Sequence, residues 1–155
     1  RGIPTLRFNF RGVGRSTGRF DEGYGERDDV RAALDEAARR FPGARVCLGG
    51  VSFGSWVGFP VGCADARVAL LIGAGVPVSL LAPNDLEGCT IPKLIVQGQR
   101  DEYSPEPEVR AWFARLPEPK RLVVVEGADH LFANHQAELR QALATLLDDA
   151  LSSAE

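Results

Sequence analysis

Three residues of the chain have the types that nucleophilic acyl chemistry requires, and each follows a short apolar run. Ser52 lies in Gly50-Val51-Ser52-Phe53-Gly54, and Asp101 and His130 come just after two later runs. A serine hydroxyl is a weak nucleophile until a base removes its proton, and an imidazole is a suitable base near neutral pH. A carboxylate then holds the tautomer of the imidazole and stabilises its cation. The order Ser, Asp, His therefore predicts a nucleophile, its orienting acid and its base.

The glycines around Ser52 add a steric argument. A serine at a sharp strand-to-helix turn has a strained backbone, so the residues two positions away on either side must be small to let strand and helix approach. We therefore expect both Gly50 and Gly54 to be required. The same turn directs the backbone N–H of Phe53 toward an oxyanion that forms beside Ser52.

Alternating strand-like and helix-like segments would position these residues. Strands are predicted at 5–10, 45–49, 68–72, 93–97 and 121–126, and helices at 26–41, at 52–63, after a Ser104-Pro105 cap, and over the closing segment from Leu139. Because the strands are continuous apolar runs separated by helices, we predict an α/β fold with a mostly parallel sheet covered on both faces. We expect a single domain over residues 1–155. Ligands of such sheets bind at the carboxyl ends of the strands, where all three residues fall.

Composition excludes several classes of function. The chain has 155 residues, 45% of them hydrophobic and 25% charged, with a formal net charge of −3. No basic patch or stripe is present, which argues against a nucleic-acid partner. No apolar run approaches the roughly 20 residues that cross a bilayer. Arg1-Gly2-Ile3-Pro4 has neither the basic nor the apolar block of a secretory signal.

The three cysteines, Cys47, Cys63 and Cys89, are an odd number without a CxxC pair or a nearby histidine. This pattern predicts buried free thiols rather than a disulfide framework or a zinc site. A reducing compartment and a cytoplasmic location follow as the default expectation. We expect no metal.

Blander interpretations of the same residues are open. Ser52 could be an ordinary helix N-cap after a strand, and His130 could be a loop histidine without a functional role. Asp101 competes with Glu102 and with Asp129, although Asp129 is too close in sequence to reach the ring of His130 easily.

A glycine-rich loop, Arg11-Gly12-Val13-Gly14, follows the first predicted strand and invites a dinucleotide-binding interpretation. The next glycine, Gly18, comes one residue late for that fingerprint, and no helix is predicted until about Glu26. We therefore expect no nucleotide cofactor.

Four stretches together resemble the α/β-hydrolase superfamily. They are Phe8-Asn9-Phe10-Arg11-Gly12-Val13-Gly14-Arg15-Ser16, Gly50-Val51-Ser52-Phe53-Gly54, Gln97-Gly98-Gln99-Arg100-Asp101 and Gly127-Ala128-Asp129-His130. The four stretches occur in family order, and the resemblance extends over nearly the whole chain. They look most like small, lidless bacterial members that are dienelactone-hydrolase-like or esterase-like. The resemblance implies Ser52 as nucleophile, His130 as general base and then acid, Asp101 as orienting carboxylate, and the Phe53 N–H as one oxyanion donor.

The chain departs from the family pattern at its start. In the family, an earlier strand lies between the strand predicted at 5–10 and the strand before Ser52, and the loop after it gives the second oxyanion donor. Nothing before Arg1 is present, so we expect the chain to be the C-terminal two-thirds of the usual fold. An uncovered sheet edge there could recruit a second copy as a homo-oligomer.

The expected function is a carboxylesterase-like serine hydrolase that cleaves a carboxylic ester or related small acyl substrate through an acyl-enzyme. The stretch 74–92 is too short for a large lid, which favours small, soluble substrates. The first alternative is an impaired or inactive hydrolase-like binding protein without the second oxyanion donor. The second is a different enzyme that uses the same site, such as a thioesterase, a peptidase or a haloalkane-type hydrolase. A haloalkane-type hydrolase would require a carboxylate nucleophile at position 52, and the serine there argues against it.

Overall fold

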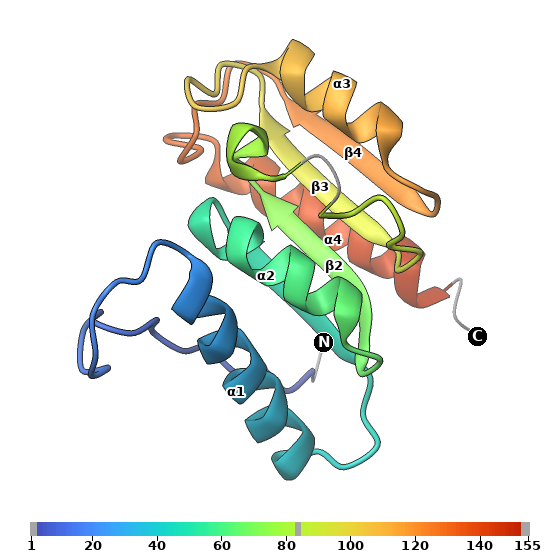
Figure 1. Ribbon diagram of the computed structural model, residues 1–155. Coiled ribbons are helices and arrows are strands. Elements are labelled where there is room, and N and C mark those ends of the chain that lie inside the picture. Colours follow the sequence, from blue (N-terminus) through green and yellow to red (C-terminus); the bar gives the residue numbers. More distant parts are fainter. Residues whose placement is uncertain (1–2, 83–84, 153–155) are drawn as a thin grey trace.

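The chain folds around one sheet of four parallel strands (Figure 1). The computed structural model describes residues 3–82 and 85–152. The strands are β1 (Val46–Val51), β2 (Val68–Ala74), β3 (Lys93–Gly98) and β4 (Lys120–Val125), and they lie side by side in the order β1-β2-β3-β4. Because all neighbouring pairs are parallel, the carboxyl ends of the four strands lie along the same edge of the sheet.

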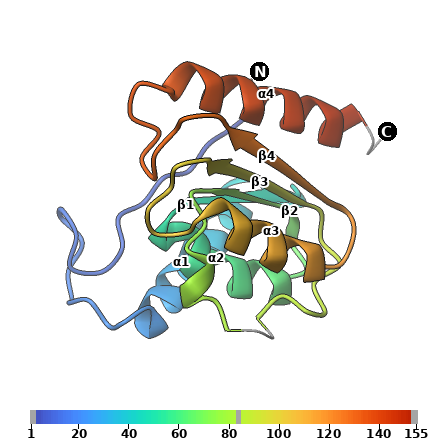
Figure 2. The same ribbon diagram turned by 90° about the horizontal axis from the view of Figure 1, so that it is seen from above.

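Helices cover both faces of this sheet. Figure 2 shows α1 (Tyr24–Arg40), α2 (Phe53–Ala64) and α3 (Glu106–Arg115) on one side and α4 (Gln136–Ser152) on the other. α2 packs against β1 and β2, whereas α4 packs against β3 and β4. The predicted parallel α/β arrangement is therefore confirmed.

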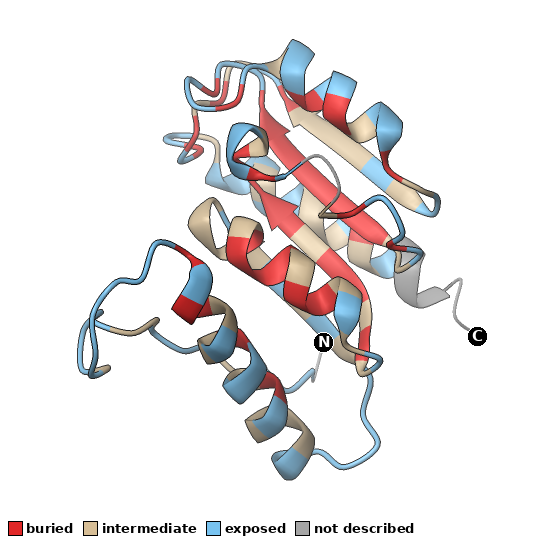
Figure 3. Cartoon of the chain, in the orientation of Figure 1, coloured by how far each residue is buried: buried red, intermediate tan, exposed pale blue. Residues whose placement is uncertain are grey.

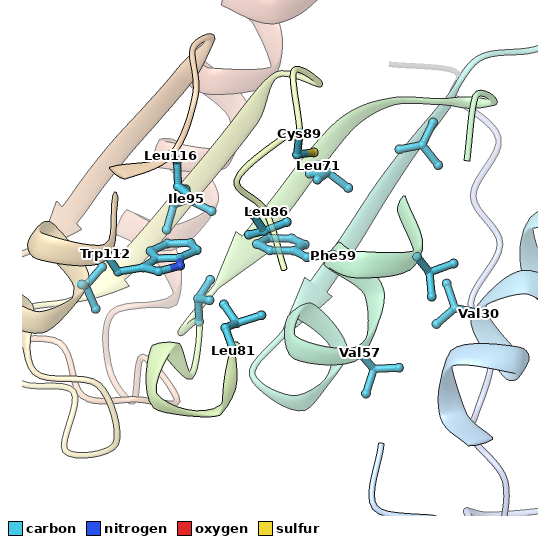
Figure 4. Close-up of a cluster of buried hydrophobic side chains, with 14 of the residues drawn as sticks. Val30, Val57, Phe59, Leu71, Leu81, Leu86, Cys89, Ile95, Trp112 and Leu116 are labelled. Atoms are coloured by element: carbon cyan, nitrogen blue, oxygen red, sulfur yellow. The ribbon is translucent and has the colours of Figure 1, made fainter. Parts of the chain in front are cut away.

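Two hydrophobic clusters fill the space between the helices and the sheet. The larger cluster lies under α1, α2 and α3 and includes Phe59, Leu71, Ile95 and Trp112 (Figure 4). The smaller cluster lies under α4 and includes Leu146. The middle strands are the most buried (Figure 3), and all six residues of β3 are buried. This explains why the strands read as continuous apolar runs in the sequence.

The first turn of α1 anchors that helix to the structure. The Glu26 carboxylate, only 1% exposed, accepts the N–H groups of Asp21 and Gly23, each at 2.9 Å. Gly23 precedes the helix with φ 86°, and a Cβ at this position would lie 2.7 Å from the ring of Trp56. A carboxylate at a helix N-terminus satisfies N–H groups that have no intrahelical acceptor. The sequence Pro42-Gly43 follows the end of the helix.

The strand predicted at 5–10 does not form, so the described residues contain four strands rather than the five predicted. Residues with strand propensity form a strand only when a neighbouring strand pairs with their backbone N–H and C=O groups. β1 is an edge strand, and no described strand pairs with its outer edge. The segment instead lies as an irregular chain whose Phe10 ring packs edge-on against Phe53 at 5.1 Å.

The cysteine prediction is also wrong. Cys63, near the end of α2, forms a disulfide with Cys89 in the loop between β2 and β3, and Cys47 is a free, exposed thiol. The loop folds back over α2 and brings the two Cα atoms to 5.3 Å, a distance that 26 residues of sequence separation do not reveal. The expected cytoplasmic location was based on free thiols, and the disulfide removes that basis.

Smaller differences concern the element ends. α3 begins at Glu106 with Pro105 as its N-cap, and the Ser104 hydroxyl, expected to cap it, accepts the N–H of Val78 at 3.1 Å instead. The described residues between β2 and β3 contain one short 3₁₀ helix, Val78–Leu80. Within the described ranges, we find no helix whose length and apolar character would let it span a membrane.

Candidate active site

Ser52 occupies a strained turn between β1 and α2. Its backbone angles are φ 48° and ψ −116°, a conformation that costs a residue with a side chain about 1–3 kcal/mol. Hydrogen bonds hold the turn: the Ser52 N–H donates to the Ala74 carbonyl at 2.9 Å, and the Ser55 hydroxyl donates to the Ser52 carbonyl at 2.6 Å. The sharp strand-to-helix turn predicted around Ser52 is therefore present.

The steric requirement applies to only one of the two glycines. A Cβ on Gly50 would lie 2.3 Å from the backbone carbon of Gly54 and 2.4 Å from the nitrogen of Ser55. A Cβ on Gly54 would meet nothing within 4 Å. The prediction is therefore right for Gly50 and wrong for Gly54. β1 approaches the backbone of residue 54, whereas a Cβ on that residue would project into open space.

His130 connects Ser52 to Asp101. Its Nε2 lies 2.8 Å from the Ser52 Oγ, and its Nδ1 lies 2.8 Å from the Asp101 Oδ2. An ionised carboxylate can only accept, so in this arrangement the proton of the neutral ring is on Nδ1 and Nε2 accepts the Ser52 hydroxyl proton. His130 is 6% exposed and Asp101 3%, so bulk water competes little for these bonds. The structure thus brings all three predicted residues into one hydrogen-bonded chain.

Four donors surround the Asp101 carboxylate. Oδ1 accepts the backbone N–H groups of Tyr103 and Ser104, both at 2.9 Å. Oδ2 accepts the His130 Nδ1–H and, at 2.6 Å, the side-chain amide of Gln97. Both oxygens are therefore fixed in direction by the surrounding chain.

The rival carboxylates bind elsewhere. Glu102 accepts the backbone N–H of His130 at 3.4 Å, and Asp129 accepts the backbone N–H of Ala133 at 2.8 Å. Of the three candidates, Asp101 is the one hydrogen-bonded to the imidazole.

Three residues beside His130 were not among the predicted site residues. Gln97 belongs to the Gln97–Asp101 motif, and its signal is a polar side chain at the end of an otherwise apolar strand. Gly75 has φ 57°, and a Cβ on it would lie 3.0 Å from the His130 carbonyl oxygen and 3.4 Å from Nδ1. The Tyr103 ring lies edge-on to the imidazole, with 4.7 Å between the two ring centroids, and Tyr103 itself is 64% exposed. No sequence pattern singles out the last two.

Aromatic side chains pack beside Ser52. Phe53 contacts Phe10, Phe20 and Trp56, with ring centroids at 5.1, 6.0 and 5.5 Å. Phe53 is the first residue of α2, so its N–H has no intrahelical acceptor. Phe59 and Phe132 are each 1% exposed and belong to the core.

Two charged groups outside the Ser52–His130–Asp101 chain have shifted pKa values. The Arg11 guanidinium donates to Asp29 from Nη2 at 2.9 Å and from Nε at 3.2 Å, and these hydrogen bonds hold the pKa of the Asp29 carboxyl below its usual value. Farther away, burial lowers the pKa of Lys93, whose Nζ donates to the carbonyls of Cys89, Ile91 and Pro117. No cluster of three or more His, Cys, Asp or Glu side chains suited to a metal ion occurs in the part of the chain that the structure describes.

The chain is similar to known proteins over nearly its whole length. A family model described as an alpha/beta hydrolase domain matches residues 1–154. An alpha-beta serine hydrolase homologue from Coxiella burnetii is 37% identical, with a TM-score of 0.82 over 91% of this chain and 67% of the other. A protein from Agrobacterium tumefaciens is 30% identical, with a TM-score of 0.92 over 98% of this chain and 72% of the other. A serine hydrolase without a lid from Xanthomonas campestris is 34% identical, with a TM-score of 0.80 over 88% and 62%. The chain spans 63% and 64% of the length of two curated relatives.

Proposed function

The chain belongs to the alpha/beta hydrolase family, as its four motifs predicted, and we propose that it is a serine hydrolase acting on a carboxylic ester or related small acyl compound. One observation carries the proposal. The Ser52 Oγ, the His130 ring and the Asp101 carboxylate form a continuous chain of two hydrogen bonds, each 2.8 Å long, at the carboxyl ends of β1, β3 and β4. This is the arrangement that activates a serine hydroxyl.

The proposed reaction has two halves. His130 Nε2 takes the Ser52 hydroxyl proton while Oγ bonds to the substrate carbonyl carbon, and the Phe53 N–H donates to the resulting oxyanion. Asp101 stabilises the imidazolium through Nδ1–H. The tetrahedral intermediate then collapses: its bond to the leaving oxygen breaks, and His130 gives that oxygen the proton. Water, deprotonated by His130, then attacks the acyl carbon; the bond from that carbon to Oγ breaks, and His130 returns the proton to Ser52 as the acid leaves.

The size of the substrate follows from the loops around the site. Among its described residues, the β2–β3 connection contains only the one-turn helix Val78–Leu80, and the Xanthomonas campestris relative is named as a serine hydrolase without a lid. Long-chain lipids need an apolar cover, so we propose short, soluble acyl substrates. We also propose that residues 1–155 form one domain that corresponds to about two-thirds of the longer family fold.

A second candidate is a hydrolase-like binding protein of reduced activity. The outer edge of β1 has no described partner strand, and the donor loop expected from such a strand is not among the described residues. The loss of one oxyanion donor costs about 2.7–4 kcal/mol of transition-state stabilisation, or about 10²–10³ in kcat. A measurable but slow turnover would favour this candidate.

Labelling with a fluorophosphonate probe tests the proposal. The wild-type protein should react, Ser52→Ala should not, and His130→Ala should react far more slowly because the hydroxyl loses its base. Ser79→Ala, at an exposed serine of the short 3₁₀ helix, is the matched control and should label like wild type. Labelling that survives Ser52→Ala would refute the assignment of the nucleophile. Ser52 labelling without ester turnover would favour the second candidate.

A further inference from the structure

Gln97 is a buried amide at the carboxyl end of β3, and its side chain joins three parts of the chain around His130. Its Nε2 donates to the Asp101 Oδ2 at 2.6 Å and to the Ser104 carbonyl at 3.4 Å. Its Oε1 accepts the backbone N–H of Val76 at 3.0 Å. The residue is 0% exposed, so water does not replace these partners.

The orientation of this amide is determined by its partners. If the amide were flipped, Oε1 would face the negative Asp101 oxygen, and Nε2 would face the N–H of Val76, which is also a donor. Both contacts would then be repulsive in a buried setting. Gln97 therefore serves as a donor toward the carboxylate and as an acceptor toward Val76.

The turn that Gln97 holds lies directly against His130. A Cβ on Gly75, the residue before Val76, would lie 3.0 Å from the His130 carbonyl oxygen and 3.4 Å from the ring atoms Nδ1 and Cε1. The same turn is tied a second time to the segment after Asp101, because the Val78 N–H donates to the Ser104 Oγ at 3.1 Å. One amide thus supports the carboxylate that binds the imidazole and the turn on which the imidazole rests.

We propose that Gln97 is a positioning residue for proton transfer between Ser52 and His130, an inference that rests on the proposed function. It fixes the rotation of the Asp101 carboxylate by donating to Oδ2, the same oxygen that accepts the His130 Nδ1–H. Two donors share the negative charge of that oxygen, so each is held less strongly than it would be alone. Gln97 therefore limits how tightly Asp101 holds the imidazolium, in addition to keeping the two groups aligned.

Two substitutions separate these effects. Gln97→Glu is almost isosteric but replaces the donor with a second carboxyl, and Gln97→Leu removes the polar group. For both we expect kcat to fall about 10- to 100-fold with KM within about threefold, since misplacement by about 1 Å costs about 10²-fold. The matched control is Ile95→Val, two residues earlier on the same face of β3, which should leave kcat and the pH profile unchanged.

The pH dependence distinguishes a positioning role from general stability. In Gln97→Leu, Oδ2 is left to His130 alone, so the acid limb of the kcat/KM profile should move upward by about 0.5–1 pH unit, the shift that corresponds to one hydrogen bond. In Gln97→Glu, the loss relative to wild type should be larger at pH 8 than at pH 6, because two adjacent carboxylates repel unless they share a proton.

The results that would overturn the inference are distinct from those that would overturn the function. A folded Gln97 variant with kcat/KM within twofold of wild type and an unshifted profile refutes the role of Gln97, while Ser52 labelling of the wild type keeps the proposed function. Failure of the wild type to label refutes the function itself. If neither variant folds, hydrogen exchange on the wild type decides: the Gln97 side-chain protons should exchange far more slowly than those of the exposed Gln136, and equal rates refute the inference.

Discussion

Replacing Gly50 or Gly54 with alanine makes the same chemical change at two positions with opposite expected results. At Gly50, the new Cβ would lie 2.3 Å from the backbone carbon of Gly54, and ordinary contact begins near 3.4 Å. The obstacle is backbone, so α2 has to move away from β1 by about 1 Å. Ser52 lies between these two residues, and its 2.8 Å hydrogen bond to His130 would be broken or badly misaligned.

The magnitudes follow from that displacement. Overpacking of this kind costs about 1–3 kcal/mol of stability, which lowers Tm by about 3–10 °C in a protein of this size. Misplacement of a reacting group by about 1 Å lowers kcat/KM about 10²-fold. Gly54→Ala meets no neighbour within 4 Å and replaces a helical glycine, so its stability should stay level or rise by up to about 1 kcal/mol.

The assay measures Tm by calorimetry and kcat/KM with a short-chain aryl ester for both variants and the wild type. Fluorophosphonate labelling rates give a second measure of the reactivity of Ser52. Equal damage from the two substitutions would refute the reasoning, because it would mean that the approach of β1 to the helix does not decide which glycine is required. A Gly50→Ala protein with normal Tm and activity would refute it as well.

Three further predictions concern the surroundings of the site. The Arg11 hydrogen bonds lower the pKa of Asp29, so the stability that they contribute is complete above the ordinary carboxyl pKa and is lost as the pH falls through the pKa of the folded state. Asp29→Asn should therefore flatten the acid side of a curve of unfolding free energy against pH, measured with urea. An unchanged curve would contradict this. Reduction of the Cys63–Cys89 disulfide, or the substitution Cys63→Ser, should lower the free energy of unfolding by about 3.5 kcal/mol, the value for a separation of 26 residues. A Tm that does not change when reductant is added would argue against the disulfide. The unpaired outer edge of β1 should cause concentration-dependent self-association that Cys47→Lys suppresses, and a wild type that sediments as a monomer at all concentrations refutes this.

The meeting of the three candidate residues could be predicted because it depends on where they fall relative to the strand ends. Ser52, Asp101 and His130 each follow an apolar run, and parallel strands bring such positions to one edge. All three acidic candidates lie between Ser52 and His130 along the chain, so their order does not separate Asp101 from Glu102 and Asp129, whereas the hydrogen bond to the imidazole does. Local sequence was sufficient to predict that these positions meet, because the fold places every strand end on the same side.

Other features depend on contacts between distant residues, which local patterns do not encode. The segment 5–10 has strand composition, but a strand exists only when another backbone pairs with it. Cys63 and Cys89 pair because a loop folds back over α2. Gln97 acquires its importance from Val76 and Asp101, which reach it from different segments. Each of these outcomes requires the positions of at least two elements.

The bond between Ser52 and His130 joins residues 78 positions apart, in the segments that follow the two outermost strands of the sheet. Helices form within about a microsecond, whereas parallel pairing over such separations is slow because loop closure must come first. On the proposed function, the helical circular dichroism signal should therefore recover during refolding from denaturant well before ester turnover returns. The return of turnover would then report the last docking event, because Ser52 and His130 meet only once both outer strands have joined the sheet.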